Sequence, residues 1–291
     1  MIVGSANERL QNLMHLYFTK MQSLGNDFVV LDGVSRPVEI SPSIARKIAD
    51  RHFGIGCDQI LLVEPGAETD FRFRIFNQDG SEVEQCGNGA RCFAQFVRHK
   101  GLTEKDEITV QTSNARMVLT VRPDQSICVE MGVPEFEPER IPFDAPRMAD
   151  VYSLSLGDAD IEISAVAIGN PHSVLLVADV DSAPVARWGQ IIESHDRFPQ
   201  RVNAGFMQII SPGHIRLRVY ERGVGETLGC GSGACAAVVV GIARGLLHSS
   251  VRVSLPGGDA MVDWQGKDQP VYLSGPAHTI FSGEIDLENL H

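Results

Sequence analysis

The amino-acid sequence predicts an α+β protein of two similar domains, each a mixed β-barrel-like sheet wrapped around a central helix. Three observations support this class. The two halves carry the same motifs at a fixed spacing, both halves alternate short β-strand patterns with turn residues, and each half has a helix that follows a cysteine and glycine motif. With 291 residues, the chain is long enough for two modest domains with sizeable cores.

The repeat has an offset of 144 residues, which is the spacing between Cys86 and Cys230. At this offset RIFN (Arg74–Asn77) falls on RVYE (Arg218–Glu221). The other matched positions are Gly25-Asn26 with Gly169-Asn170, Gln59 with Asn203, Glu82 with Glu226, Gly87 and Gly89 with Gly231 and Gly233, Ala90 with Ala234, Gly101-Leu102 with Gly245-Leu246, and Met117-Val118 with Met261-Val262. One ungapped offset over this length indicates two copies of one domain.

The domain boundaries follow from this repeat. Gly132–Arg147 (GVPEFEPERIPFDAPR) contains four prolines and is typical of a connection between domains. We expect residues 1–13 to be an N-terminal extension, because the recognisable pattern begins only after them. The first domain should comprise residues 14–131 together with the C-terminal residues 276–291, and the second should comprise 132–275.

Local patterns predict the elements of the first half. Ser41 as N-cap, Pro42 at the first helical position and Gly54 after the end indicate a helix. A second helix follows the first cysteine motif and ends at Gly101. Short runs of β-branched and aromatic residues between turn residues indicate strands at 27–33, 58–64, 71–76, 107–112 and 116–121.

The second half repeats this arrangement. The helix that ends at Gly245 is apolar nearly all round, so it must be surrounded, as when a curved sheet wraps it. Strand patterns lie at 163–168, 173–179, 206–212, 214–220 and 251–255.

Composition excludes several classes of protein. Lys plus Arg is 25 and Asp plus Glu is 37, and the resulting net charge of −12 argues against binding to nucleic acid or an anionic membrane. The N-terminus lacks the apolar core of a secretory signal. The longest apolar run is too short for the roughly 20 residues that cross a bilayer. We therefore expect a cytoplasmic protein.

The chain has six cysteines, and in a reducing cytoplasm they should be free thiols. There is no C-x-x-C pair, so the sequence predicts no metal site. Cys92 and Cys235 leave their helices on other faces than Cys86 and Cys230, and we interpret them as core residues. The six are Cys57, Cys86, Cys92, Cys128, Cys230 and Cys235.

The paired motif CGNG and CGSG offers a sulfur and an anion site in each half. A thiol at a helix N-terminus lies against unsatisfied backbone N–H groups and the positive end of the helix dipole, which can lower its pKa. The glycines let backbone N–H groups approach a ligand closely, and such a helix N-terminus also binds carboxylates.

Pseudo-twofold symmetry should aim the two helix N-termini at each other across a cleft between the domains. A carboxylate held there would have the sulfur of Cys86 on one face of its α-carbon and that of Cys230 on the other. One thiolate removes the α-proton and the opposite thiol delivers a proton, so the stereocentre inverts. The N–H groups stabilise the developing charge, and the reaction needs no cofactor.

Three other interpretations of the motifs remain open. Gly229–Ala234 (GCGSGA) fits a dinucleotide-binding pattern by letter, but it does not follow an apolar strand and the first copy breaks it at Cys92. The cysteines could also form a disulfide between the halves, or they could be ordinary buried thiols.

Taken together, six ordered blocks resemble the diaminopimelate epimerase family. The resemblance implies an enzyme that interconverts LL- and meso-2,6-diaminopimelate without a cofactor, in lysine and peptidoglycan precursor synthesis, with two similar domains and a homodimeric assembly. The blocks are GNDFVV (Gly25–Val30), CDQILLVE (Cys57–Glu64), FNQDGSEVEQCGNGARC (Phe76–Cys92), GNPH (Gly169–His172), VNAGFMQ (Val202–Gln208) and RVYERGVGETLGCGSGACA (Arg218–Ala236).

The resemblance also assigns site residues. Cys86 and Cys230 match the family's acid/base pair, and His172 and Glu221 resemble its auxiliary catalytic pair. The residues that match the contacts to the substrate diaminopimelate are Asn26, Gln59, Asn77, Gly87, Asn88, Asn170, Asn203, Glu221, Arg222, Gly231 and Ser232.

The two copies of the repeat carry different residues at positions where an asymmetric substrate tail would require different contacts. Asn77 falls on Glu221 and Gln78 on Arg222. Arg222 could bind a distal carboxylate through two hydrogen bonds, although a solvated charged strand end explains either residue taken alone. The alternatives are a racemase of proline or hydroxyproline, a phenazine-pathway type isomerase of the same architecture, and a non-catalytic amino-acid binding module.

Overall fold

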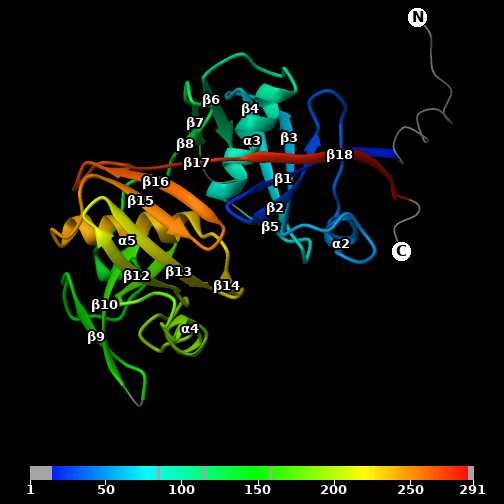
Figure 1. Cartoon of the computed structure of the whole chain (residues 1–291). Coiled ribbons are helices and arrows are strands. Elements are labelled where there is room, and N and C mark those ends of the chain that lie inside the picture. The colour runs from blue at the N-terminus through cyan, green and yellow to red at the C-terminus, as the bar shows by residue number, and fades with distance from the viewer. Residues whose placement is uncertain (1–14, 84–85, 114–115, 158, 288–291) are drawn as a thin grey trace, which may run out of the picture. The chain divides into compact units, whose positions relative to one another are not determined.

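The computed structural model describes residues 15–83, 86–113, 116–157 and 159–287 (Figure 1). The expected N-terminal extension, 1–13, lies outside this part of the chain. The internal contacts divide the chain into two compact units, one formed by 1–127 with 276–291 and the other by 128–275. Within the described ranges no helix is both long and apolar enough to cross a membrane.

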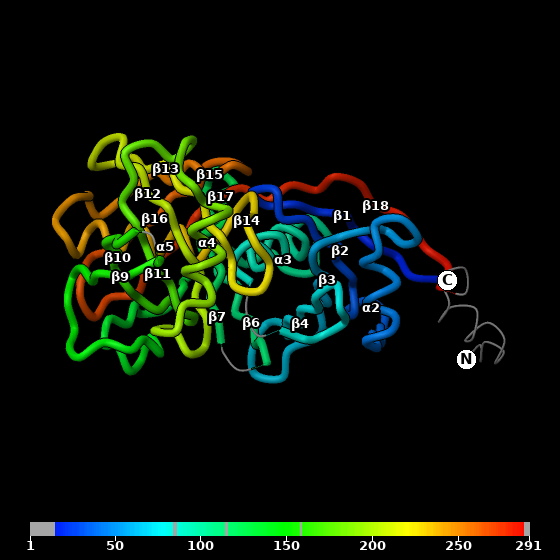
Figure 2. Tube along the Cα trace, turned by 90° about the horizontal axis from the view of Figure 1, so that it is seen from below, coloured from blue at the N-terminus to red at the C-terminus, as the bar shows by residue number. Residues whose placement is uncertain are grey.

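The sheet of the first unit is mixed. β1 pairs antiparallel with β2, β2 pairs parallel with β3, β3 antiparallel with β4, β4 parallel with β6, and β6 antiparallel with β7. β5 pairs with β4, and β18 runs back along β1 (Figure 2). The strands are β1 (His15–Ser23), β2 (Asn26–Asp32), β3 (Gln59–Pro65), β4 (Phe71–Asn77), β5 (Glu82–Val83), β6 (Glu107–Gln111), β7 (Arg116–Val121) and β18 (His278–Asp286).

The second unit has the same order of pairing. β10 pairs antiparallel with β11, β11 parallel with β12, β12 antiparallel with β13, β13 parallel with β15, and β15 antiparallel with β16. The strands are β8 (Ile127–Glu130), β9 (Tyr152–Ser155), β10 (Asp160–Ala167), β11 (Pro171–Leu176), β12 (Asn203–Ser211), β13 (His214–Glu221), β14 (Gly225–Thr227), β15 (Ser250–Leu255), β16 (Gly258–Trp264) and β17 (Val271–Gly275), with a 3-10 turn at Pro138–Arg140.

The strand register repeats as well as the strand order. Phe28 on β2 lies opposite Gln59 on β3, and 144 residues later His172 lies opposite Asn203. The internal repeat therefore describes two copies of one mixed sheet, which confirms the predicted α+β class with two similar domains.

The offset of 144 does not hold to the end of the repeat. Val110 pairs with Met117 in the first unit, whereas Val253 pairs with Ala260 in the second. Met117 therefore corresponds to Ala260, and the expected match to Met261 is wrong. The reason is that the connection before β15 is one residue shorter than the connection before β6. The connecting residues are 100–106 in the first unit and 244–249 in the second.

A buried helix lies among the strands of each unit (Figure 1). α3 (Gly87–His99) packs against β1, β2, β3 and β7, and α5 (Gly231–Ala243) packs against β10 to β13, β16 and β17. Burial of α5 is nearly continuous from Gly231 to Gly241, as its apolar sequence predicts. Gly101 and Gly245 follow these helices with φ of 68° and 70°, a left-handed conformation that ends a helix and favours glycine.

A second helix covers the outer face of each sheet. α2 (Pro42–Ala49) is capped by Ser41 as predicted, but it ends before Gly54 because the carboxylate of Asp50 accepts the backbone N–H groups of His52 and Phe53. α4 (Val185–Glu193) occupies the corresponding place in the second unit and was not predicted. Its N-cap is Pro184, which provides no capping side chain, so the usual start signal is missing.

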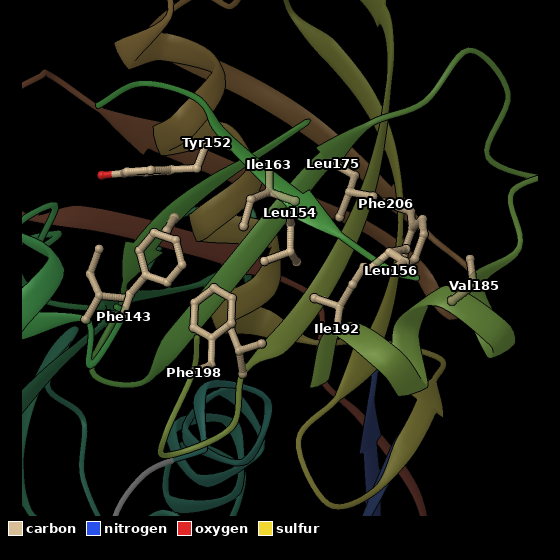
Figure 3. Packing of buried hydrophobic residues seen from close by; sticks show 14 of the residues in the cluster. Phe143, Tyr152, Leu154, Leu156, Ile163, Leu175, Val185, Ile192, Phe198 and Phe206 are labelled. Atoms are coloured by element: carbon tan, nitrogen blue, oxygen red, sulfur yellow. The ribbon is translucent and has the colours of Figure 1, made fainter. Parts of the chain in front are cut away.

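The outer core of the second unit lies under α4 (Figure 3). Ile192 of α4 packs with Phe206 of β12, and the rings of Phe143 and Phe198 stack with their centroids 4.5 Å apart. This layer holds α4 against the strands that carry Asn203 and Glu221. The position of those two side chains therefore depends on close packing at α4.

Gly189 is where α4 approaches β13 most closely. A Cβ atom at this position would lie 2.5 Å from Cβ of Tyr220, the residue before Glu221. We expect Gly189→Ala to destabilise the protein by about 1–3 kcal/mol, because overpacking outweighs the better helix propensity of alanine. Urea denaturation would measure this. Gln190→Ala, at an exposed position of the same helix, is the control, and a more stable Gly189→Ala variant would contradict the packing argument.

Candidate active site

Both motif cysteines are the N-cap residues of the buried helices. Cys86 caps α3 with φ −149° and ψ 107°, and Cys230 caps α5 with φ −104° and ψ 108°. The sulfur of Cys86 accepts the backbone N–H of Gly89 at 3.3 Å. The two copies therefore place a thiol at the same position, against the unpaired N–H groups of a helix N-terminus.

The glycine three residues after each cysteine lies in a tight space. A Cβ on Gly233 would lie 3.2 Å from Sγ of Cys230 and 3.0 Å from Val219, and a Cβ on Gly89 would lie 3.2 Å from Leu61 and 3.4 Å from Cβ of Cys86. A larger residue at Gly233 would push against Cys230 and Val219, and one at Gly89 would push first against Leu61. This close approach explains why glycine occurs at this position in both copies.

The same ion pair braces the hairpin that leads to each cysteine. Arg74 on β4 donates two hydrogen bonds to Glu82, at 2.9 and 2.8 Å. Arg218 on β13 donates two to Glu226, at 2.6 and 2.9 Å. These four residues match at the repeat offset, so part of the repeated sequence serves to hold the strands before the cysteines.

The first unit brings Asn26 and Asn88 together beside Cys86. The amide oxygen of Asn26 lies 3.8 Å from Sγ of Cys86 and 3.4 Å from Nδ2 of Asn88. Gly87 lies between Cys86 and Asn88 in the first turn of α3. Three of the expected site residues therefore form one polar cluster at this helix N-terminus.

Gln59 and Asn77 form a second polar pair in this unit. They lie opposite each other on β3 and β4, and Nε2 of Gln59 donates to the amide oxygen of Asn77 at 2.9 Å. Oε1 of Gln59 is buried without a hydrogen-bond partner. A buried acceptor of this kind is available to a donor group on a ligand.

In the second unit, His172 and Asn170 lie at the start of β11. Nε2 of His172 is 2.9 Å from the amide oxygen of Asn170. Burial lowers the pKa of His172 to about 3, and the charge of Arg222 contributes to this shift. His172 is therefore neutral at physiological pH. An amide oxygen only accepts, so the proton lies on Nε2 and Nδ1 remains an acceptor.

Asn203 fixes the backbone that carries Arg222. Its amide oxygen accepts the backbone N–H of Arg222 at 2.9 Å, and its Nδ2 donates to the carbonyl of Pro171 at 3.0 Å. The guanidinium of Arg222 donates to the carbonyl of Gln200 at 3.2 Å. Asn203 thus connects the backbone of Arg222, the residue that follows β13, to the start of β11.

Glu221 lies close enough to Cys230 to affect its ionisation. Burial raises the pKa of Cys230 well above its usual value, and the carboxylate of Glu221 raises it further. The backbone N–H of Gly233 and the hydroxyl of Ser232, 3.7 Å from the sulfur, only partly offset this rise. The expected lowering of the thiol pKa therefore does not hold for Cys230, because burial outweighs the helix N-terminus.

Two further residues position these groups, and the sequence analysis missed both. Thr227 on β14 donates its hydroxyl to Oε1 of Glu221 at 2.5 Å. Glu193, buried at the end of α4, accepts the backbone N–H of Gly223 at 2.8 Å and pairs with Arg201 at 2.6 Å. Thr227 stands in the quoted motif GETLGC, where it could have been noticed. Glu193 belongs to the helix that had no start signal.

The expected residues thus form separate groups, each within one unit. His, Cys, Asp and Glu side chains of the described residues form no group of three or more arranged to hold a metal ion. The acid/base chemistry available in each unit is that of a thiol at a helix N-terminus, with amide or carboxylate partners.

The sequence matches the family model for diaminopimelate epimerase over residues 18–137 and 164–280, one stretch in each half of the chain. Diaminopimelate epimerase of Nitrosospira multiformis is 56% identical over 276 residues, which covers 94% of this chain and 100% of that protein. The corresponding protein of Azoarcus sp. is 59% identical over 276 residues with the same coverage.

Solved structures show the same fold at low identity. A phenazine biosynthesis protein of the PhzF family from Bacillus anthracis matches with a TM-score of 0.68 and 15% identity, over 93% of this chain and 99% of that chain. A hydroxyproline epimerase from Agrobacterium vitis matches with a TM-score of 0.66 and 16% identity, over 94% and 92%. At such identities only the fold is shared, whereas the relatives above match in sequence over nearly the whole chain. This protein therefore belongs to the diaminopimelate epimerase family.

Proposed function

We propose that this protein is an epimerase that interconverts LL-2,6-diaminopimelate and meso-2,6-diaminopimelate, in the synthesis of lysine and peptidoglycan precursors. The identity of 56% and 59% to two proteins named diaminopimelate epimerase carries this proposal. The two N-cap cysteines support it, because two acid/base groups on opposite faces of a carbon can invert it. Incubation of the purified protein with LL-diaminopimelate in D2O, followed by NMR of the α-proton, tests the activity directly.

Cys86 and Cys230 are the two acid/base groups of the proposed mechanism. One sulfur, as thiolate, takes the α-proton as the Cα–H bond breaks, and the other donates its S–H proton to the opposite face of the carbon. The N–H groups of Gly87, Asn88, Gly231 and Ser232 stabilise the charge that develops on the reacting carboxylate. No cofactor is required by this sequence of steps.

Glu221 and His172 are the auxiliary bases of the proposal. The raised pKa of Cys230 keeps it a thiol before substrate binds, so a base must accept its proton when it acts as thiolate. Glu221 is the neighbouring carboxylate whose charge acts on this thiol. Neutral His172, with Nδ1 free of a proton, has the ionisation state that a base requires.

The two-base mechanism predicts different exchange behaviour for the two cysteine variants. With Cys86→Ala, inversion should stop in both directions, while Cys230 still exchanges the α-proton of one stereoisomer for deuterium. Cys230→Ala should do the same for the other stereoisomer. Mass spectrometry of each isomer in D2O measures the exchange, with Cys128→Ala as an active control. Exchange of both isomers by one single variant would indicate one mobile base instead.

Arg222 is proposed to bind the carboxylate at the far end of the substrate, and Glu221 its ammonium group, together with Asn26, Gln59, Asn77, Asn170 and Asn203. We expect Arg222→Ala to lower kcat/KM by the equivalent of about 1.5–3 kcal/mol of transition-state binding, because the charged hydrogen bonds to the far carboxylate are lost. Steady-state kinetics would measure this. Arg216→Ala is the control, because Arg216 lies on β13, the strand that Arg222 follows, and is paired with Asp181. Equal turnover of lysine and diaminopimelate would rule out this role.

The proposal includes a cytoplasmic homodimer assembled through β1 and β18. The first five residues of β18 are all exposed, on both faces of the strand. Ile280 and Phe281 are 56% and 49% exposed, and Tyr17 on the paired strand is 62% exposed. An apolar, uncovered strand of this kind usually has a partner, and a second copy of the chain satisfies it by twofold symmetry.

Loss of this apolar surface should give a monomer. We expect the double variant Tyr17→Asp/Phe281→Asp to have half the molar mass of the unmodified protein. Light scattering coupled to gel filtration measures this mass. Ile210→Asp, an equally exposed apolar position on β12, should leave the mass unchanged. A native protein of monomeric mass would refute the dimer and leave the proposed reaction untouched.

A further inference from the structure

Four side chains form a hydrogen-bonded chain beside Cys86, with opposite charges at its two ends. Oδ2 of Asp58 accepts from Nδ2 of Asn26 at 2.8 Å. The amide oxygen of Asn26 accepts from Nδ2 of Asn88 at 3.4 Å, and the amide oxygen of Asn88 accepts from Nη2 of Arg91 at 2.6 Å. All four residues belong to the first unit.

The charged ends allow only one direction for this chain. A carboxylate accepts and a guanidinium donates, so Asp58 requires the NH2 side of Asn26 and Arg91 requires the oxygen of Asn88. Rotation of either amide by half a turn would set acceptor against acceptor or donor against donor. The orientation of both amides is therefore determined by the two charged residues.

Both charged residues are themselves held in place. Asp58 accepts from Arg51 at 2.8 Å and from the backbone N–H of Asp27 at 3.2 Å. Arg91 is fully buried, and its Nε and Nη2 donate to the hydroxyl of Ser23 at 3.1 and 2.9 Å. The ends of the chain are thus fixed to β1, β2 and the loop before β3.

The orientation of Asn26 decides which group faces the sulfur of Cys86. The amide oxygen lies 3.8 Å from Sγ, where it accepts the S–H proton. The reversed amide would present N–H groups instead, which stabilise a thiolate. An acceptor beside the sulfur favours the protonated form.

The second unit has no charged residue at the positions that correspond to Asp58 and Arg91. At the repeat offset, Asp58 corresponds to Val202 and Arg91 to Cys235. There the amide oxygen of Asn170 is engaged by His172. The charged chain is therefore a feature of the Cys86 side alone, although both units share the fold, the helix and the cysteine.

We infer that Asp58 and Arg91 are positioning residues that lock the amide of Asn26 with its oxygen toward Cys86, and thereby hold Cys86 as a thiol before substrate binds. The inference rests on the proposed function only in treating Cys86 as an acid/base group. Asp58 acts through Asn26 and has no other part in the reaction.

A double-mutant cycle on the full-length protein tests this. Asp58→Ala should lower kcat/KM for LL-diaminopimelate about tenfold to a hundredfold, because a misplaced group at the reacting centre has effects of this size. In the Asn26→Ala background the same change should have less than about a twofold further effect, since residues that act as a unit are non-additive. Full additivity of the two losses would overturn the inference.

The alkylation rate of Cys86 by iodoacetamide at one fixed pH is the second readout, followed by peptide mass spectrometry. Asp58→Ala should raise this rate several-fold by letting the amide turn its N–H groups to the sulfur, and should add nothing to Asn26→Ala. An unchanged rate in Asp58→Ala would overturn the inference. This readout does not require turnover, so an inactive native protein would refute the proposed function and still leave the lock testable.

Two further variants distinguish the specific effect of Asp58 from a general loss of structure. Asp58→Asn keeps an acceptor for Asn26 but removes the charge, and in both readouts it should lie between the native protein and Asp58→Ala. If Asp58→Ala does not fold, this smaller change in both readouts carries the test, and native values for Asp58→Asn would then overturn the inference. Asp70→Ala is the matched control, because Asp70 likewise accepts a backbone N–H, that of Thr109, and pairs with a cation, Lys105. An equal effect of Asp70→Ala would show a general loss of structure and overturn the inference.

Discussion

The N-terminus of a buried helix is the constraint on which the rest of this structure depends. Its first N–H groups have no partner within the helix, and burial removes the water that would otherwise satisfy them. Cys86 and Cys230 occupy the N-cap of α3 and α5, and glycines in the first turn bring the backbone close to the sulfur. The surrounding sheet, the braced hairpins and the outer helices all serve to place this helix end.

Duplication supplies two such helix ends, and the polar residues around them differ between the two copies. Register, helix bounds and the arginine–glutamate brace are common to both units. The polar partners are not. In the first unit two amides lead from Cys86 to a carboxylate and a guanidinium, whereas in the second unit the carboxylate of Glu221 acts on Cys230 and a histidine pairs with the amide of Asn170.

The ionisation of the thiols is set by competing effects of the same helix end. Its dipole favours a thiolate, but burial opposes any charge, and at Cys230 burial together with the carboxylate of Glu221 prevails. At Cys86 the orientation of one amide determines whether the sulfur faces an acceptor or a donor. At Cys230, therefore, burial and the neighbouring carboxylate outweigh the effect of the helix end.

The sequence by itself determined the duplication, the fold class, the paired cysteines at helix starts and the family, because these depend on local patterns and on identities at a fixed spacing. It did not determine α4, whose N-cap has no capping side chain, or the slip to Ala260, which depends on a connection one residue shorter. The raised pKa of Cys230 and the contacts of Asp58 and Glu193 were decided by tertiary structure alone. Burial, amide orientation and contacts between distant residues exist only once the strands have paired and the helices have packed.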